Sequence, residues 1–110
     1  MNFEIIATPH FQREFKKLLK KFPSLHSDIL TLSKTLRDNP ITGNEVFKNC
    51  YKIRFAIKSK GKGKSGGGRL ITYVQVTNGR VYLLAIFDKS EKENVTDAYL
   101  KQLLKELLAL

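Results

Sequence analysis

The sequence predicts an α+β fold of two layers, in the order βααβββα, within one domain spanning residues 1–110. Three observations support this prediction. Residues 9–39 carry apolar side chains at helical spacing, residues 47–87 follow strand patterns, and residues 96–108 return to helical spacing. Consecutive strands joined by short turns pair antiparallel, so we expect an antiparallel sheet with the helices on one face.

The N-terminal part is expected to form a short strand, residues 3–7, and a helical hairpin. Thr8 and Pro9 suit a helix start, because threonine caps free amide groups and proline loses no hydrogen bond at the first helical position. The apolar stripe of this helix is Phe11, Phe15, Leu18, Leu19 and Phe22. Pro23 separates it from a second helix, which ends at Asp38-Asn39-Pro40 and whose stripe is Leu25, Ile29, Leu32 and Leu36.

Strand patterns begin after Pro40. Apolar side chains fall on odd positions, at Phe47, Tyr51, Ile53, Phe55 and Ile57, and a second strand spans residues 69–77. Asn78-Gly79 predicts a two-residue type I′ turn, which needs a positive φ at both positions. Residues 81–87 are apolar on both faces, which indicates a central strand. Thr96 then caps a C-terminal helix with the stripe Leu100, Leu103, Leu104, Leu107 and Leu108.

Positive charge is concentrated in the middle of the chain. The 20 Lys and Arg residues outnumber the 10 Asp and Glu residues, for a formal net charge of +10. Nine of the cations, and no acid, lie between Val46 and Phe87. A block of one sign indicates an anionic partner, and nucleic acid is the commonest one. A basic face that is merely solvated is the alternative.

Several function classes find no support in the composition. No apolar run is long enough for a membrane span, and the N-terminus lacks the pattern of a secretory signal. The single Cys50 cannot form an internal disulfide, which favours the cytoplasm. His10 and His26 have no partner at ligand spacing, so we expect neither a metal nor another cofactor. Catalysis would have to use lysine, arginine, tyrosine or backbone groups.

Residues 59–69, SKGKGKSGGGR, invite comparison with a phosphate-binding P-loop. That motif requires a glycine at position 58, where this chain has Lys58, and it joins a strand to a helix rather than two strands. A plain hairpin connection is the simplest alternative. However, lysines separated by glycines can approach a phosphate backbone closely. We therefore predict nucleic-acid contacts at Lys58, Lys60, Lys62 and Lys64.

Further candidates lie on the predicted strands and just after them. Lys52 and Arg54 are two residues apart on one strand and therefore point to the same face, and Arg69 and Tyr73 lie on the next strand. Lys89 and Lys92 follow the third. We expect Lys52, Arg54 and Arg69 to converge in one pocket. Tyr73 could stack on a base, although strand aromatics usually belong to the core.

The segments CYKIRFA (50–56), GKGKSGGGRLITY (61–73) and DKSEKENVT (88–96) resemble the RelE/HigB toxins of bacterial toxin–antitoxin modules, within the RelE/ParE superfamily. The likeness covers nearly the whole chain and is greatest to the HigB-type branch. It implies a metal-independent endoribonuclease that cuts messenger RNA, typically in the ribosomal A site near the 16S rRNA, and thereby arrests growth. It also implies a neutralising antitoxin, usually a small DNA-binding protein.

The family's basic strand residues match Lys52, Arg54 and Arg69. Where the best-known ribosome-dependent cleaver has an arginine and a tyrosine after the last strand, this chain has Ser90 and Thr96. Cleavage by attack of the 2′-OH needs a base, stabilisation of the phosphorane and a proton for the leaving oxygen.

Our hypothesis is that Lys52 acts as the base and that Arg54 and Arg69 stabilise the negative charge of the phosphorane. Lys89 or Lys92 would assist the leaving group or bind a neighbouring phosphate. Two alternatives remain open: a ParE-like toxin that poisons DNA gyrase, and an RNA-binding module without catalysis.

Overall fold

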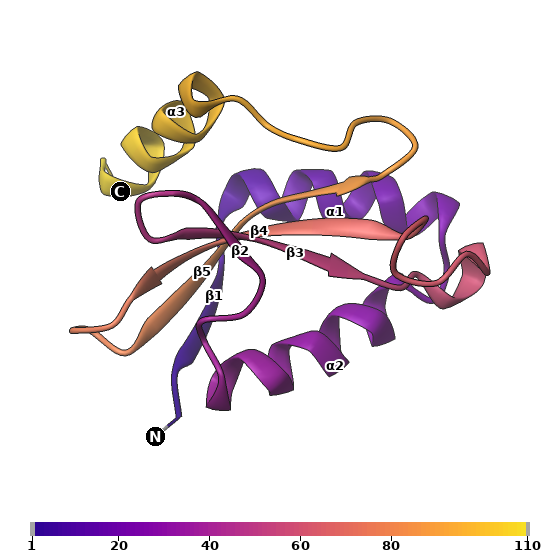
Figure 1. The fold of residues 1–110 in the computed structure, drawn as a ribbon, viewed down its shortest axis with the longest axis horizontal. Coiled ribbons are helices and arrows are strands. Elements are labelled where there is room, and N and C mark those ends of the chain that lie inside the picture. The colour runs from indigo at the N-terminus through magenta and orange to yellow at the C-terminus, as the bar shows by residue number, and fades with distance from the viewer. Residues whose placement is uncertain (1, 110) are drawn as a thin grey trace.

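The computed structural model describes residues 2–109, which form five strands, three α-helices and a short 3₁₀ turn (Figure 1). In chain order the elements are β1 (Glu4–Ala7), α1 (Pro9–Lys21), α2 (Leu25–Asp38), β2 (Asn44–Phe47), β3 (Cys50–Phe55), the 3₁₀ turn η1 (Lys58–Lys60), β4 (Gly68–Gln75), β5 (Arg80–Asp88) and α3 (Asp97–Leu108). The α+β class, the helical hairpin and the C-terminal helix are confirmed. No helix between residues 2 and 109 has the length and apolar character needed to cross a membrane.

The strands form one sheet in the order β1-β5-β4-β3-β2. The strands from β2 to β5 pair antiparallel with their neighbours, as expected, whereas β1 pairs parallel with β5. The sheet is therefore mixed. No turn joins β1 to β5, so the local rules that predict antiparallel pairing do not set the direction of this edge strand.

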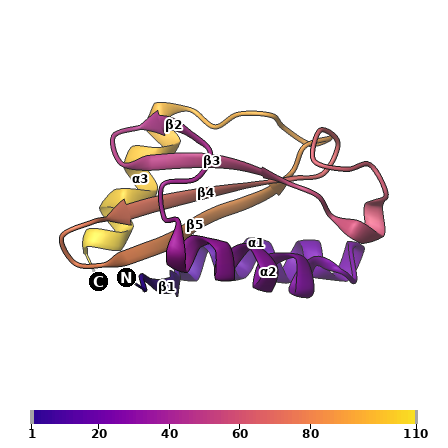
Figure 2. The ribbon, with the colours of Figure 1, turned by 60° about the horizontal axis from the view of Figure 1, so that its bottom comes forward.

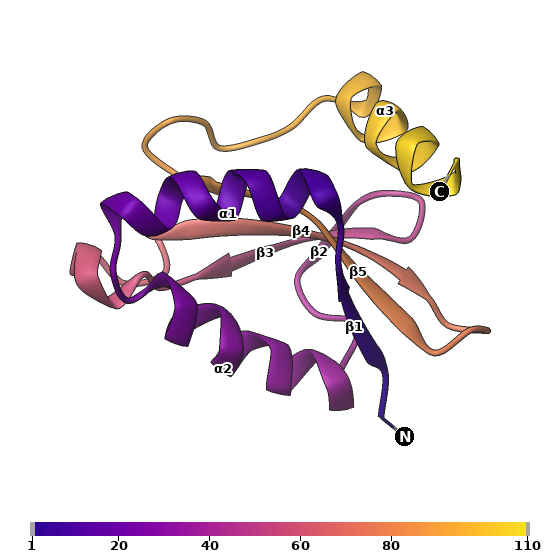
Figure 3. The ribbon, with the colours of Figure 1, turned by 180° about the vertical axis from the view of Figure 1, so that it is seen from behind.

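The helices cover both faces of the sheet (Figure 2). Helices α1 and α2 pack on one face, over buried side chains that include Leu70 and Leu83, and Figure 3 shows them from this side. Helix α3 packs Leu100 and Leu103 on the opposite face. The expectation of helices on one face is thus wrong for α3. The physical reason is the composition of β5, which buries apolar side chains on both faces and needs cover on each.

The predicted helix starts are confirmed. The Thr8 side chain accepts a hydrogen bond from the Phe11 amide at 3.2 Å, and Pro9 occupies the first turn of α1. The Thr96 hydroxyl does the same for the Tyr99 amide at 3.1 Å. These caps satisfy amide groups that the helices themselves leave unpaired.

Two turns differ from the prediction. The β4–β5 hairpin lies where Asn78-Gly79 predicts it, but its loop covers residues 76–79, and the Gly79 amide donates to the Val76 carbonyl at 3.1 Å. Gly79 has a positive φ of 63° and Asn78 does not, so the turn is not type I′. In addition, the chain folds back at Asn49, whose φ is 63°, so that Phe47 ends the separate short strand β2.

Candidate active site on the open sheet face

Three of the predicted cations gather on the face of the sheet that α3 partly covers. Lys52 and Arg54 alternate with the core residue Ile53 along β3, and Arg54 pairs in register with Arg69 on β4. The segment between β5 and α3 returns across this end of the sheet (Figure 1). Lys52, Arg54 and Arg69 therefore come together at one face of the sheet, but not as the open pocket we expected: Arg69 is buried, and the groove between α2 and the edge of β3 is lined by Arg54 and by neither of the other two.

A carboxylate that we did not predict lies among these cations. Glu93 Oε2 accepts a hydrogen bond from Arg69 Nε at 3.1 Å, and Glu93 Oε1 lies 3.7 Å from Arg54 Nη2. The Lys52 ammonium donates to the Glu93 carbonyl at 3.4 Å and to the side-chain oxygen of Asn94. We call these five residues the cation–carboxylate cluster.

The charge of Glu93 follows from these neighbours. Partial burial raises the pKa of its carboxyl, but the hydrogen bond and charge of Arg69, with the charges of Lys52 and Arg54, outweigh burial and hold the pKa below the ordinary value. Glu93 is therefore ionised at neutral pH and marks a position where the protein holds an anion.

Arg69 is the most enclosed member of the cluster, with 1% of the residue exposed. Besides contacting Glu93, its Nη1 donates to the carbonyls of Lys64 at 3.0 Å and Gly68 at 2.9 Å, and its Nη2 donates to the Ser65 carbonyl at 3.2 Å. A buried guanidinium needs such acceptors to offset its desolvation. Arg69 thus ties the glycine-rich loop and the segment containing Glu93 to the sheet.

The four lysines of the loop region fall into two groups. Lys60 turns to the buried Asp88, with its Nζ 2.5 Å from Oδ1, and is partly shielded from solvent. Burial raises the pKa of the Asp88 carboxyl, but the hydrogen bonds from Lys60 and Ser90 and the charge of Lys60 lower it by more. The pKa of Asp88 therefore lies below its ordinary value. Lys58, Lys62 and Lys64 are exposed. Their positions leave them available to an anionic partner, whereas Lys60 serves an internal ion pair.

Lys58 and Lys64 also line a groove of about 360 Å³ between α2 and the edge of β3, where Arg54 joins them. Register explains this groove: β2 pairs with β3 only as far as Lys52, so β2 leaves the edge beyond it uncovered. The groove connects the cation–carboxylate cluster to the loop lysines through Arg54.

The remaining predicted residues lie apart from the cluster or at its margin. Lys89 is exposed. Lys92 places its ammonium over the rings of Phe87, at 5.0 Å, and Tyr99, at 4.8 Å. Tyr73 pairs with Cys50, at the opposite end of β3 from Arg54, and belongs to the apolar cluster beneath α3. The structure does not bring Tyr73 to the cations.

The glycines before Arg69 have a packing role. A Cβ built on Gly68 would lie 2.4 Å from the Phe55 ring, and one on Gly67 would lie 2.3 Å from the Phe55 carbonyl oxygen. The loop therefore passes so close to β3 that side chains at these positions would overlap it.

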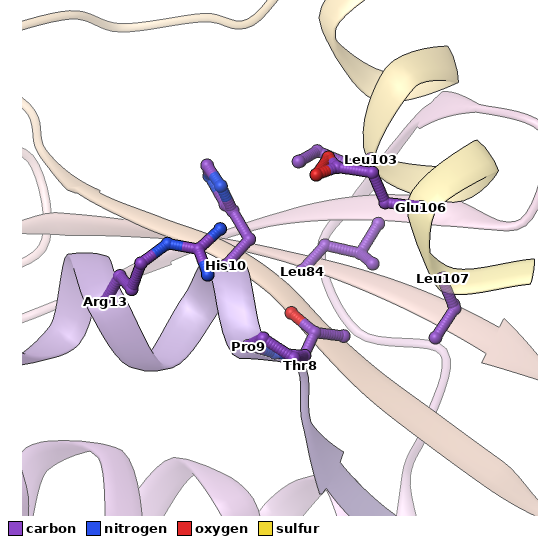
Figure 4. Close-up of a pocket in the computed structure, with 8 residues that line it drawn as sticks. All are labelled: Thr8, Pro9, His10, Arg13, Leu84, Leu103, Glu106 and Leu107. Atoms are coloured by element: carbon purple, nitrogen blue, oxygen red, sulfur yellow. The ribbon is translucent and has the colours of Figure 1, made fainter. Parts of the chain in front are cut away.

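A separate cavity of about 140 Å³ lies between α1 and α3, above Leu84 (Figure 4). On its rim His10 Nε2 lies 2.7 Å from the Tyr99 hydroxyl and 3.2 Å from Glu14 Oε1. These contacts link the two helices. Among residues 2–109, no three His, Cys, Asp or Glu side chains gather as metal ligands would. Cys50 is fully buried, and burial together with Glu45 raises its pKa to about 11, so it stays a thiol.

Glu93, Asn94 and Asp88 are the site residues that sequence reasoning missed. Their sequence signal is weak. Acids reappear at Asp88 after a block of cations, but residues 89–96 have no periodicity that would say which of them faces the sheet.

Comparison with known proteins supports the fold. No family model matches the chain. A mutant of the E. coli toxin RelE in the free state superposes with a TM-score of 0.61 at 16% identity, over 84% of this chain and 90% of that chain. The isolated E. coli RelE toxin superposes with a TM-score of 0.59 at 14% identity, over 94% of this chain and 97% of that chain. The chain therefore has a RelE-like fold.

Proposed function

We propose that this protein is a toxin of the RelE/HigB type, an endoribonuclease that cleaves messenger RNA without a metal. The observation that carries the proposal is the gathering of Lys52, Arg54 and Arg69 around an anion on one sheet face. The motifs in residues 50–56, 61–73 and 88–96 and the likeness to solved structures of the toxin RelE support it.

The cluster suits the charge that develops during RNA cleavage. Attack by the 2′-OH creates a crowded, doubly negative phosphorane, and fixed cations stabilise that charge more than they stabilise the ground state. Arg54 has 56% of its side chain exposed and can reach a phosphate from solution. Arg69 is held rigidly by the loop carbonyls. Lys89 or Lys92 would bind a neighbouring phosphate or assist the leaving group.

The partners follow from the same proposal. The protein would act in the cytoplasm, on mRNA in the ribosomal A site beside the 16S rRNA, and would arrest growth. The exposed Lys58, Lys62 and Lys64 supply sequence-independent contacts to RNA backbone. A cognate antitoxin, itself a DNA-binding protein, would neutralise the toxin.

Pulsed expression in bacteria tests the proposal. We expect growth arrest and new mRNA ends by primer extension, in codon phase if the ribosome is required. Arg54→Ala and Lys52→Ala should abolish both effects, whereas Lys101→Ala on α3, outside the cation–carboxylate cluster, should not. Intact mRNA with broken DNA would point to gyrase instead, and RNA binding with neither kind of damage would point to a binding module.

A further inference from the structure

We propose that Glu93 is the proton acceptor in the cleavage reaction and that Lys52 is a proton donor. This inference rests on the proposed function, and it deepens that function by assigning the acid and base at the same site. It replaces the hypothesis that Lys52 acts as the base.

The donor pattern of the cluster motivates the assignment. Arg54 and Arg69 can donate hydrogen bonds to phosphate oxygens but can neither give up nor accept a proton, because guanidinium stays charged in proteins. The two contacts of the Lys52 ammonium, to the Glu93 carbonyl and to Asn94, are also donated. Within the cation–carboxylate cluster, the Glu93 carboxylate is ionised and can therefore accept a proton.

Position supports the same role. The carboxylate oxygens lie 3.1 Å from Arg69 Nε and 3.7 Å from Arg54 Nη2, so a phosphate held by these arginines would lie next to Glu93. The side chain is 38% exposed and stands on the irregular segment between β5 and α3. It can therefore rotate aside for a phosphate and still reach a neighbouring ribose.

Substrate binding would strengthen the base. In the free protein the cations depress the pKa of Glu93 and make it a weak acceptor. A phosphate that takes over part of the arginine contacts removes this stabilisation and adds a negative charge nearby, and both changes raise the pKa of the carboxyl. Glu93 would thus become most basic when the substrate is in place.

Two protons move between the protein and the RNA in the proposed step. The Glu93 carboxylate takes the proton of the 2′-OH, and the 2′ oxygen forms a bond to phosphorus. The bond from phosphorus to the 5′ oxygen breaks, and that oxygen takes a proton from the Lys52 ammonium. The products are a 2′,3′-cyclic phosphate and a 5′-OH, after which Glu93 and Lys52 exchange protons with water.

Single-turnover cleavage of mRNA on programmed ribosomes tests the inference. Glu93→Gln removes the proton acceptor but keeps an oxygen for Arg69, so the cleavage rate should fall by roughly 10²–10⁴. Binding to the same ribosomes should be unchanged or tighter, because an anion is lost from a phosphate site. Glu91→Gln, a nearby exposed carboxylate outside the cluster, should cleave like the wild type.

The pH profile separates catalysis from structural support. At saturating ribosomes the wild-type cleavage rate should rise with pH as Glu93 ionises in the complex, and Glu93→Asp should retain that limb at a lower rate, whereas Glu93→Gln should lose it. A wild-type rate at saturating ribosomes that does not rise with pH below neutrality overturns the inference, even where Glu93→Gln does not fold.

Two further outcomes separate a failure of this inference from a failure of the proposed function. A Glu93→Gln variant that cleaves as fast as the wild type, or faster, overturns the inference and leaves the nuclease function intact; the carboxylate would then only compete with phosphate. A wild-type protein that cleaves no mRNA overturns the proposed function itself.

Discussion

Arg54 and Arg69 face each other across two strands, yet they differ in what they contact. Arg54 has 56% of its side chain exposed, and its ion pair is the longer 3.7 Å contact to Glu93. Arg69 is buried and donates to Glu93, to the loop carbonyls of Lys64 and Ser65, and to the carbonyl of Gly68 at the start of β4. The first arginine is free to meet a ligand, while the second also supports the site.

This difference predicts unequal effects on stability. Arg69→Ala removes a buried side chain and the hydrogen bonds that it donates to the Lys64, Ser65 and Gly68 carbonyls, and it should lower the free energy of unfolding by roughly 2 kcal/mol. Arg54→Ala should change it by about 0.5 kcal/mol or less, as exposed positions do. Urea unfolding followed by circular dichroism measures both. Equal losses of stability in the two variants would show that Arg69 does not hold the loop. Because we expect Arg54→Ala to change stability little, it is the cleaner test of function.

Residue periodicity identified part of the site. Strand alternation correctly placed Lys52 and Arg54 on one face, because side chains two apart point the same way. It could not place Glu93 or Asn94, which lie on an irregular segment. Nor could it foresee that Lys60 turns to the buried Asp88, or that Tyr73 lies beneath α3. The roles of the exposed lysines stay predictions.

Among the elements, the loop from η1 to β4 combines two functions. Its exposed part carries Lys62 and Lys64, and its glycine end packs against β3. Glycine at positions 67 and 68 is therefore explained by the close approach of the chain to Phe55, without a phosphate-binding role.

Gly68→Ala tests this interpretation. The added methyl would lie 2.4 Å from the Phe55 ring, so the ring or the strand must shift. We expect a loss of roughly 1–3 kcal/mol in the free energy of unfolding. Ser65→Ala, at an exposed side chain of the same loop, should be near neutral. A Gly68→Ala protein with wild-type stability would argue against the packing role.

At the scale of the whole molecule, the net charge of +10 is distributed unevenly. The acids of the C-terminal part fold back onto the basic middle, where Glu93 meets Arg54 and Arg69 and Asp88 meets Lys60. The loop lysines Lys62 and Lys64 remain exposed. The outward-facing charge is thus smaller than the sequence block implies, but it is concentrated beside the cluster.

Salt dependence measures how many of these cations contact RNA. Each phosphate contact to a single strand contributes about 0.7 to the slope of log K against log salt. The double variant Lys62→Ala/Lys64→Ala should therefore reduce that slope by about 1.4 in fluorescence titrations with single-stranded RNA. The double variant Lys101→Ala/Lys105→Ala on α3 should leave it unchanged. Equal salt slopes in the two double variants would show that the loop lysines do not contact RNA.

Local patterns in the chain are enough to predict the α+β class, the helix starts, the helical hairpin and the shared face of Lys52 and Arg54, because caps and side-chain periods act over a few neighbouring residues. The parallel pairing of β1, the placement of α3 on the second face and the entry of Glu93 among the cations emerge only when the chain is folded. These features join segments distant in the chain, so their geometry depends on how the whole sheet packs and on which charges must be compensated once buried.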